Sequence, residues 1–329
     1  MTTVRDVAKR AGVSVGTVSR VLSKNETVKQ PLKERVQKAM QELDYKPNLA
    51  ARALRTSRVA VVGLVVPDIT NPFFAQLAKC IETEAAKRNH SVMLANSHDD
   101  EETERKQISA LLDHAPRGVI VVAASDTGAL GYDTIVPIIS LDRRFERYPL
   151  IATDHSDGSA KIADHLYSLG HRNIAYIAGP QNTEVGRSRK DGFLSRIKAL
   201  GHADDPFTLQ VLEGQFDYEH GEDIGRQILQ SSASGRPTAI AAASDQLAIG
   251  VLRAARDLKI DVPSELSVTG FDDISLARLV VPRLTTVRQP TDLLAQTALE
   301  QIFEEKGIRK EQPLKGDIVI RGSTGPAQN

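Results

Sequence analysis

The chain has 329 residues, and its 42 lysine and arginine residues are balanced by 42 aspartate and glutamate residues. The charges are unevenly distributed, because residues 1–58 carry 13 basic and 5 acidic side chains, a formal charge of +8, and the rest of the chain carries −8. With 41% hydrophobic and 26% charged residues, the composition is that of a globular protein and argues against a disordered chain. We therefore expect two modules, a basic one that faces a polyanion and a larger acidic one that does not.

The first 47 residues predict three short helices around one small core. Gly12 supplies the turn between the first two helices, and Ser14 caps the second. The third opens at Pro31 and stops at Pro47. Apolar side chains recur at helical spacing in each helix: Val4, Val7, Ala8 and Ala11, then Val15, Val18 and Leu22, then Leu32, Val36, Ala39 and Leu43. Two short helices joined through a glycine turn form a helix-turn-helix.

The second helix carries short and polar side chains besides its core residues. They are Val15, Gly16, Thr17, Ser19 and Arg20. Short side chains let the backbone approach a DNA major groove, and an arginine one turn later can bind guanine O6 and N7. A solvated helix face is the alternative, but the +8 charge combined with the helix-turn-helix spacing favours DNA. Residues 12–16 also match the G-x-S-x-G motif of α/β-hydrolases, which requires a preceding strand that is not expected here.

Residues 48–55 form a second basic segment, rich in helix-forming residues and capped by Asn48. Its eight residues fall short of the ~12–15 that an isolated helix needs in water. We therefore expect this helix to form only against a partner, such as its twin across a dimer axis and a DNA groove. Leu54 lies beside Arg52 and Arg55, as an apolar wedge among phosphate-binding side chains would. An inert linker is the alternative interpretation.

From residue 59 onward, apolar runs alternate with helical stretches. We expect strands at residues 59–66, 91–94, 118–122, 136–141, 173–178, 208–212, 239–243 and 266–271. Continuous runs of Val, Ile, Ala and Leu that alternate with helices indicate buried parallel sheets in an α/β fold. About eight such units exceed one small sheet, so we expect two subdomains, with extended crossing segments at residues 156–158 and 288–290.

Polar and aromatic side chains lie just past the carboxyl ends of the predicted strands, where open α/β sheets bind their ligands. They are Asp68, Asn71, Phe73, Asp142, Arg143, Arg189, Phe216, Asp245 and Asp272. Carboxylates, amides and arginines hydrogen-bond paired hydroxyl groups, and an aromatic ring packs on the C–H face of a sugar. Asp and Asn after a strand also commonly cap the next helix, which is the alternative interpretation. A purine is the less favoured ligand because carboxylates outnumber aromatic rings.

Signatures of enzymes, metal sites and membrane segments are missing from the sequence. No G-x-G-x-x-G follows a strand, and neither G-x-x-x-x-G-K-[ST] nor H-E-x-x-H occurs. Asp154 and His155 are interpreted as a helix start and His165 as part of an exposed helix face, and Cys80 supplies one thiol where a thiolate metal site needs several. No apolar stretch follows Met1, and residues 59–67, the longest apolar run, are too short to cross a bilayer. We expect a cytoplasmic protein without catalytic activity, metal or cofactor.

Two groups of motifs resemble the lac/galactose repressor (LacI/GalR) family of transcriptional regulators. Residues 4–22, 45–48 and 52–55 resemble its DNA-binding headpiece and hinge; residues 66–74, 189–193, 244–245, 270–272 and 284–290 resemble its pocket and crossover motifs, so the resemblance runs from Thr3 to about Thr324. It implies that positions 15, 16 and 20 read operator bases and that Leu54 enters the minor groove. One departure is Ser244, where many members have asparagine; the shorter side chain predicts a larger pocket or a lost hydrogen bond.

The resemblance implies a complete domain organisation. The expected parts are an all-α helix-turn-helix headpiece at 1–46, a hinge at 47–58, and an α/β body at 59–329 with the fold of a periplasmic sugar-binding protein. Two parallel-sheet subdomains are expected in the body, an N-subdomain at about 59–156 and 291–315 and a C-subdomain at about 157–290 and 316–329. The residues expected at the DNA are Thr3, Ser14, Val15, Gly16, Thr17, Ser19, Arg20, Asn48, Ala51, Arg52, Leu54 and Arg55.

The implied function is that of a ligand-responsive, sequence-specific transcriptional repressor that senses a sugar or sugar derivative. Its expected partners are double-stranded DNA with a pseudo-palindromic operator, a small effector and a second copy of the chain, and it is expected to be nucleoid-associated and to have no contact with a membrane. Two alternatives stay open: a periplasmic-type sugar receptor without a transcriptional role, and a repressor that responds to a nucleobase. The tail has no heptad extension, which argues against a tetramer.

Overall fold

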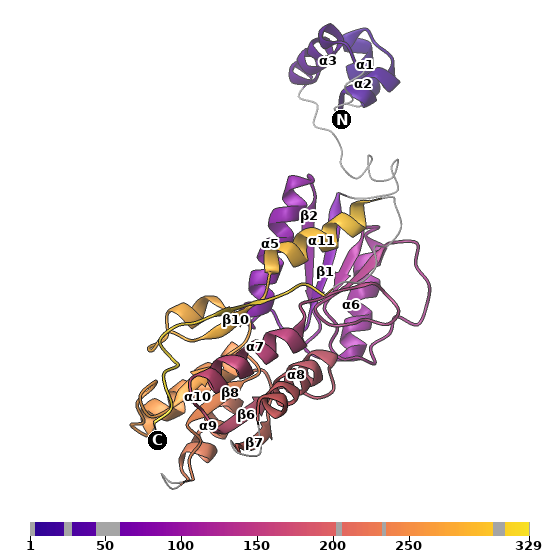
Figure 1. Ribbon diagram of the computed structural model, residues 1–329. Coiled ribbons are helices and arrows are strands. Elements are labelled where there is room, and N and C mark those ends of the chain that lie inside the picture. The colour runs from indigo at the N-terminus through magenta and orange to yellow at the C-terminus, as the bar shows by residue number, and fades with distance from the viewer. Residues whose placement is uncertain are drawn as a thin grey trace. The chain divides into compact units, whose positions relative to one another are not determined.

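The computed structural model describes residues 4–22, 28–43, 60–201, 206–231, 235–304 and 313–328, without the side chains of Ser19 and Leu22 (Figure 1). The chain divides into two compact units, residues 1–59 and 60–329, which we describe separately as the headpiece and the body. Several residues expected at the DNA lie outside the described part: Thr3, Asn48, Ala51, Arg52, Leu54 and Arg55. Among the described residues, no helix combines the length and apolar character that a membrane crossing requires.

The headpiece contains the three predicted helices, α1 (Val4–Ala11), α2 (Val15–Leu22) and α3 (Gln30–Glu42). Their shared core consists of Val7, Ala8, Ala11, Val18, Val36 and Ala39, which confirms the predicted small core. Gly12 adopts a φ of +63°, a left-handed turn that glycine makes without strain. The Ser14 hydroxyl accepts a hydrogen bond from the Thr17 amide at 3.1 Å and caps α2 as predicted. Val15, expected both in the apolar stripe of α2 and among the residues at the DNA, is 38% exposed.

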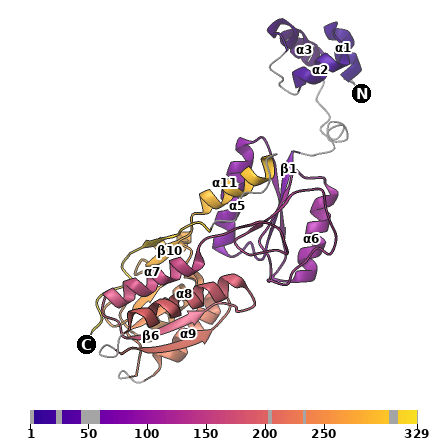
Figure 2. The same cartoon turned by 45° about the vertical axis from the view of Figure 1, so that its right-hand side comes forward.

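The N-subdomain of the body is built on a parallel five-stranded sheet with the order β2-β1-β3-β4-β5. Its strands are β1 (Val61–Val66), β2 (Ser91–Asn96), β3 (Val119–Val121), β4 (Ile138–Leu141) and β5 (Leu150–Ile151). Helices α5 (Pro72–Lys87) and α11 (Thr291–Phe303) pack together on one face of this sheet, and α6 (Glu101–Asp113) covers the other (Figures 1 and 2). Because both faces are covered, the central strands are continuously apolar, as the sequence predicted.

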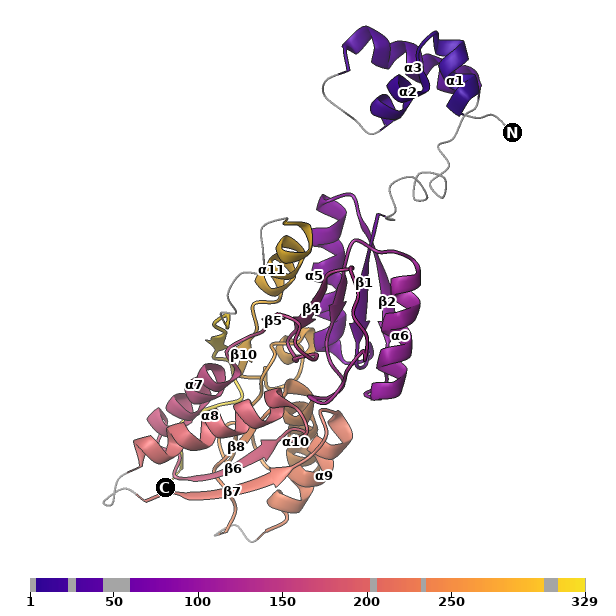
Figure 3. The same ribbon diagram turned by 90° about the vertical axis from the view of Figure 1, so that its right-hand side faces the viewer.

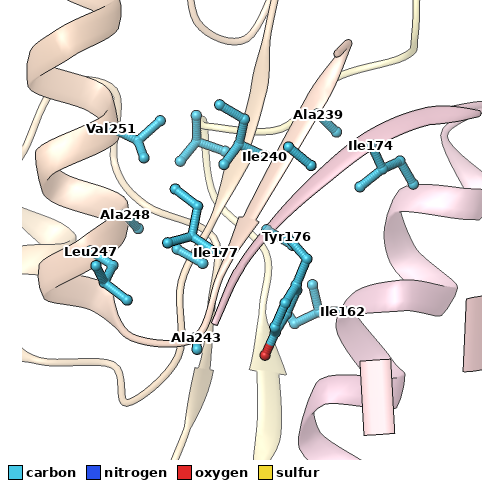
Figure 4. Packing of buried hydrophobic residues seen from close by; sticks show 14 of the residues in the cluster. Ile162, Ile174, Tyr176, Ile177, Ala239, Ile240, Ala243, Leu247, Ala248 and Val251 are labelled. Atoms are coloured by element: carbon cyan, nitrogen blue, oxygen red, sulfur yellow. The ribbon is translucent and has the colours of Figure 1, made fainter. Parts of the chain in front are cut away.

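The C-subdomain repeats this plan on a parallel four-stranded sheet with the order β7-β6-β8-β9. Its elements are β6 (Asn173–Ala178), β7 (Thr208–Glu213), β8 (Ala239–Ala242), β9 (Ser267–Thr269), α7 (His155–Ser168), α8 (Glu184–Leu200), α9 (Tyr218–Leu229), α10 (Asp245–Asp257) and the 3-10 helix η1 (Ser275–Arg278). The pairs α7/α8 and α9/α10 lie on opposite faces of the sheet (Figure 3). Leu247 and Val251 of α10 face the sheet on one side and Ile162 of α7 on the other (Figure 4).

The chain passes between the subdomains near the junction of three segments. The segment before α7 pairs with the C-terminal segment, since the Leu314 amide donates to the Ala152 oxygen at 2.8 Å and the Asp154 amide to the Leu314 oxygen at 2.7 Å. The short strands β10 (Thr286–Arg288) and β11 (Asp317–Val319) form an antiparallel pair beside it.

The structure corrects one of the two predicted crossing segments. Residues 156–158 are not extended but form the first turn of α7, because the Asp154 carboxylate accepts from the Asp157 amide at 2.9 Å and caps the helix. The crossing therefore lies just before, at residues 152–154. Residues 288–290 do connect β10 to α11, as predicted.

Two glycines set the close approach of α9 and α10. A Cβ atom on Gly250 would lie 2.3 Å from the Tyr218 oxygen and 2.4 Å from the Glu222 nitrogen, both main-chain atoms. A Cβ atom on Gly221 would meet the Leu247 oxygen at 2.3 Å. The two helices can approach this closely only where side chains are absent.

We predict that Gly250→Ala lowers the free energy of unfolding by about 1–3 kcal/mol, because α9 and α10 must move apart to admit the methyl group. The matched control is Gly225→Ala on α9, where the nearest atom to a new Cβ is 3.1 Å away and the gain in helix propensity of up to ~1 kcal/mol offsets the crowding. Urea unfolding followed by far-UV circular dichroism measures both. Equal effects of the two substitutions would contradict the close approach.

Candidate functional site

The first candidate site is the exposed face of α2 in the headpiece. Ser14, Val15, Gly16 and Arg20 are exposed on it, and Thr17 is half-buried. The fully buried Val18 anchors the opposite face of the helix in the core. The predicted residues with described side chains thus share one surface. Its side chains are small at the start of α2, and the cation of Arg20 follows one turn later, a combination that suits a DNA major groove.

The turn before α2 is held by a residue that the sequence analysis did not select. The Arg35 guanidinium of α3 donates to the main-chain oxygens of Ala11 at 2.6 Å and Gly12 at 3.1 Å. These carbonyls end α1 and lack helical partners of their own, so the arginine completes their hydrogen bonding. Arg35 therefore fixes the angle between α1 and α2. A basic residue on a third helix carries no sequence signal for such a contact.

The second candidate site, which we call the polar cleft, is a cavity of about 190 Å³ between the two subdomains of the body. The N-subdomain contributes Asp68, Asn71, Phe74, Asp99, Ala124 and Arg143, and the C-subdomain contributes Pro180, Asn182, Thr183, Gln215, Phe216 and Asp217. These residues follow β1, β2, β3, β4, β6 and β7, so the cleft lies at the carboxyl ends of both sheets, where α/β proteins bind ligands.

Four predicted residues line the polar cleft: Asp68, Asn71, Arg143 and Phe216. Three helices also begin at it, because Asn71 caps α5, Thr183 caps α8 and Asp217 caps α9. The lining therefore combines carboxylates, amides, a hydroxyl group and one guanidinium with two aromatic rings. Such a surface matches a small ligand that presents several hydroxyl groups.

Phe74, rather than the predicted Phe73, lines the cleft. Phe73 is buried in the core and touches Phe74 edge to face, with ring centroids 5.3 Å apart. The guanidinium of Arg143 lies 5.4 Å over the Phe74 ring and donates to Asp99 at 3.3 Å. Adjacent phenylalanines at a helix start are equivalent in sequence, and only the packing of α5 decides which one faces the ligand.

The cleft residues missed by the sequence analysis follow strands to which the same rule applies. Asp99 comes after β2, Asn182 and Thr183 after β6, and Gln215 and Asp217 after β7. Applying the strand-end rule to every predicted strand would have found them.

Behind the polar cleft, the predicted residues Arg189 and Asp272 form a buried ion pair of 2.9 Å. Arg189 also donates to the main-chain oxygen of Ala243 at 2.6 Å, and its guanidinium lies 3.9 Å from the centre of the Phe271 ring and 5.5 Å from that of Phe216. Burial raises the pKa of Asp272, and the Arg189 charge opposes this shift. Because Phe216 lines the cleft and Arg189 lies against it, the ion pair is one ring away from a bound ligand.

The predicted residue Asp142 lines a different cavity of about 140 Å³, the inner cavity, whose further lining residues are Leu150, Ala152, Thr153, Asp154, His155, Ser156, Glu184, Val185, Ser188 and Pro313. His155 is buried there, 3.2 Å from Asp142, and is not merely a helix-start residue. His165, predicted on an exposed face, is half-buried and contacts the Thr324 hydroxyl at 2.9 Å. Within the described ranges, no three His, Cys, Asp or Glu residues are placed to hold a metal ion.

Asp245 lines neither the polar cleft nor the inner cavity. Its carboxylate is fully buried and accepts hydrogen bonds from the Thr286 hydroxyl at 2.5 Å and the Ile274 amide at 2.8 Å. Ser244, for which a larger pocket or a lost hydrogen bond was expected, also lines neither cavity; its hydroxyl accepts from the Leu247 amide and caps α10. The structure thus gives both residues a role at the start of α10.

The two subdomains also touch through two side chains that do not line the polar cleft, Asp126 and Gln76. Asp126 of the N-subdomain accepts a hydrogen bond from the Glu184 amide of α8 at 2.9 Å and pairs with Arg187. The Gln76 side chain of α5 accepts from the Ser275 amide at 2.6 Å. A carboxylate at a helix N-terminus is electrostatically favourable, so Asp126 acts as a clasp between the subdomains.

We predict that the free energy of unfolding falls less with rising pH in Asp245→Asn than in the unchanged protein. Burial raises the pKa of Asp245 well above its usual range, and the charge of Asp272 raises it further. A carboxyl group that holds its proton more tightly when folded stabilises the native state at low pH, and this contribution is lost as the pH rises from its unfolded-state pKa toward its folded-state pKa.

Urea unfolding between pH 5 and pH 8 should therefore show the unchanged protein losing stability, relative to Asp245→Asn, as the pH rises. The exposed Asp113→Asn serves as the matched control, and its curve should run parallel to that of the unchanged protein. A parallel curve for Asp245→Asn would show that this carboxyl group is ionised in the folded state.

Two protein-family models match parts of the chain. Residues 3–48 match the model of the bacterial regulatory proteins of the lacI family, and residues 163–324 match that of the periplasmic binding protein-like domain. The ribose operon repressor of Halalkalibacterium halodurans is 36% identical over 342 residues, which cover 100% of this chain and 99% of the relative.

Two solved structures share the fold. The lac repressor dimer bound to operator and the anti-inducer ONPF matches with a TM-score of 0.82 and 27% identity, over 98% of this chain and 99% of that one. A LacI family transcriptional regulator from Enterococcus faecium with bound ribose matches with a TM-score of 0.70 and 30% identity, over 82% and 100%. These matches confirm the predicted fold, a helix-turn-helix headpiece joined to an α/β body. The chain belongs to the lacI family of bacterial regulatory proteins and is a ligand-responsive, DNA-binding transcriptional regulator.

Proposed function

We propose that the protein is a repressor whose effector is a small, uncharged sugar bound in the polar cleft. The observation that carries this proposal is the lining itself, in which three carboxylates, Asp68, Asp99 and Asp217, face one guanidinium, Arg143. A net negative lining repels a phosphorylated sugar, whereas its acceptors and amides suit hydroxyl groups. Phe74 and Phe216 provide faces on which a sugar ring can pack.

Ribose is the first effector to test. A relative that covers the whole chain is named a ribose operon repressor, and a solved structure of a family member contains ribose. A nucleobase is the second candidate, supported by the two aromatic rings in the cleft. The acidic lining favours the sugar.

We propose that the protein has no catalytic activity, since the sequence contains neither G-x-x-x-x-G-K-[ST] nor H-E-x-x-H and its relatives are regulators. The basic headpiece argues against a receptor without a transcriptional role. Binding to an operator would locate the protein at the nucleoid in the cytoplasm.

For the DNA contacts, we propose that Val15, Gly16 and Arg20 read bases, with Ser14, Thr17 and Ser19 beside them. Outside the described residues, Thr3, Asn48 and Ala51 are proposed to contact the DNA, Arg52 and Arg55 to bind phosphates, and Leu54 to enter the minor groove. The proposed division is a headpiece at 1–46, a hinge at 47–58 and a body at 59–329, with subdomain borders near residues 156, 290 and 315.

The proposed dimer surface includes the segment that follows η1. Leu279 is 70% exposed and Val281 91% exposed, and Leu276 lies beside them. Large apolar side chains gathered in one exposed segment are typical of a protein interface. The Ser275 amide is bonded to Gln76 of α5, so this surface joins the two subdomains. A dimer formed here would be sensitive to the angle between them.

The proposed mechanism links the effector to the operator through that angle. An effector that binds across the polar cleft favours one arrangement of the subdomains, which the Asp126 clasp also favours. In a dimer, this arrangement sets the distance between the two hinge segments, which are too short to be stable helices alone. Effector and operator therefore change each other's affinity by the same factor.

Arg20→Ala should weaken binding to an operator, selected from a randomised palindromic library, by about 1–3 kcal/mol, the range for one bidentate base contact. Binding to random DNA should fall much less, because phosphate contacts supply most of that affinity. The matched control is Lys38→Ala on the exposed side of α3, which should affect both DNAs equally. Fluorescence anisotropy at fixed salt measures the affinities of the unchanged protein and of both variants for the two DNAs. Equal losses for Arg20→Ala on the two DNAs would exclude it as a base reader.

The effector proposal is tested by thermal unfolding of the full chain with ribose, other free sugars, ribose 5-phosphate and adenine, because a ligand that binds the native state raises Tm. We expect a free sugar to raise Tm and the phosphorylated sugar to fail. Phe216→Ala should then weaken sugar binding by up to about tenfold through loss of ring packing. Tyr132→Ala, an exposed aromatic residue outside both cavities, is the control. Stabilisation by ribose 5-phosphate or adenine alone would overturn the choice of an uncharged sugar.

A further inference from the structure

His155 is a buried residue to which the mechanism above gives no role. It is the first residue of α7, directly after the first crossing segment, and is 6% exposed. One ring nitrogen, Nε2, lies 3.2 Å from Oδ1 of Asp142, which follows β4 in the N-subdomain. The other, Nδ1, lies 3.3 Å from Nε of Arg189 in the C-subdomain. The imidazole therefore stands between a carboxylate of one subdomain and a guanidinium of the other.

The arginine contact determines which ring nitrogen carries the hydrogen. A guanidinium nitrogen donates hydrogen bonds and never accepts one. Nδ1 of His155 must therefore be the acceptor, and in the neutral ring the hydrogen is on Nε2, the nitrogen that faces Asp142. A hydrogen on Nδ1 and the Arg189 contact exclude each other.

Asp142 is suited to face this hydrogen. Burial alone would raise the pKa of Asp142, but the contact with His155 and the nearby arginine charges lower it below its usual range, so the group is a carboxylate. Nε2 and Oδ1 are close but not aligned for a hydrogen bond, and neither atom has another hydrogen-bond partner. A small shift of one subdomain against the other is enough to align this pair or to break it.

The same contacts continue into both crossing segments. Asp272 accepts from Arg189 at 2.9 Å and from the Gln289 side chain at 2.7 Å, and Thr153 donates to Gln289 at 2.6 Å. Thr153 is two residues before His155 in the chain. Thr153 of the first crossing segment is thus connected to Gln289 of the second. Gln289 is connected through Asp272 and Arg189 to His155.

We propose that His155 is the positioning residue that couples Arg189, beside the effector cleft, to the arrangement of the subdomains through Asp142. An effector that packs on Phe216 shifts the Arg189 guanidinium, which lies 5.5 Å from the centre of that ring, and so changes the contact that Arg189 makes with Nδ1. The ring then moves relative to Asp142, and the two subdomains change their relative position. The coupling to an effector rests on the proposed function, whereas the orientation of the ring does not.

The first test is independent of any effector or DNA. Nuclear magnetic resonance of the full chain, labelled in its histidine rings with ¹⁵N and ¹³C, reports the hydrogen position in each ring, and His155→Gln identifies the His155 signal by its loss. We expect a neutral ring with its hydrogen on Nε2. A ring with its hydrogen on Nδ1 would overturn the proposal, because Nδ1 could then not accept a hydrogen bond from Nε of Arg189.

The second test uses D-ribose as the probe and operator affinity with and without it as the readout. His155→Phe keeps the buried ring but removes both polar contacts, and should reduce the ribose-induced change in operator affinity by about tenfold or more. His155→Gln offers an oxygen to Arg189 and an amide group to Asp142, and should retain most of the change. Urea unfolding first establishes that both variants are folded.

The ribose response and a double-mutant cycle test the coupling separately. A full ribose response in a folded His155→Phe variant would overturn the coupling. If the unchanged protein does not respond to ribose, the proposed effector is wrong, and the ring orientation together with a double-mutant cycle decides about His155. In that cycle, the unfolding effects of His155→Phe and Asp142→Asn should be non-additive. Additive effects would show that the two side chains do not interact.

Discussion

The buried guanidinium of Arg189 is the constraint on which the arrangement of the body depends. A cation removed from water costs several kcal/mol unless charge and hydrogen bonds replace its hydration. Here the replacement comes from separate segments of the C-subdomain: Asp272, the main-chain oxygen of Ala243, the ring of His155, and the faces of Phe271 and Phe216. Most of these groups lie at the end of a strand or the start of a helix. The position of one side chain on α8 therefore restrains where β8 and β9 end and where α7 begins.

The same network lies where two arrangements of the subdomains would differ from each other. Each subdomain has its own apolar core and a parallel sheet covered on both faces, so it moves as a unit. The polar contacts gather where the chain crosses between the units, with Thr153 in one crossing segment and Gln289 in the other. Hydrogen bonds can be exchanged for others at little net cost, whereas a close-packed core deforms reluctantly. A ligand in the polar cleft is therefore expected to rearrange these contacts and to leave both cores unchanged.

The parts of the fold that follow from continuous sequence patterns were predictable, and the parts that depend on contacts between distant residues were not. All eight expected strands are present because most of them are nearly continuous apolar runs, whereas β5, β10 and β11 are two or three residues long and were not expected. In the site, the strand-end rule found Arg143 and Phe216 in the polar cleft. It also selected Asp245, which resembles Asp272 in sequence but is bonded to Thr286, 41 residues away. Its use as a structural group is visible only once the chain is folded.

The turn at residues 142 and 143 connects the lining of the two cavities. Asp142 has a φ of +63°, in the left-handed region that few residues other than glycine adopt. This backbone directs two successive charged side chains to different places, since Asp142 lines the inner cavity and Arg143 lines the polar cleft. Both belong to one turn at the end of β4, whose amide at Asp142 is bonded to the oxygen of Ile151. We therefore expect a ligand that moves Arg143 to move Asp142, which faces His155, as well. The polar cleft and the inner cavity would then be connected through this turn in the N-subdomain and through Arg189 in the C-subdomain.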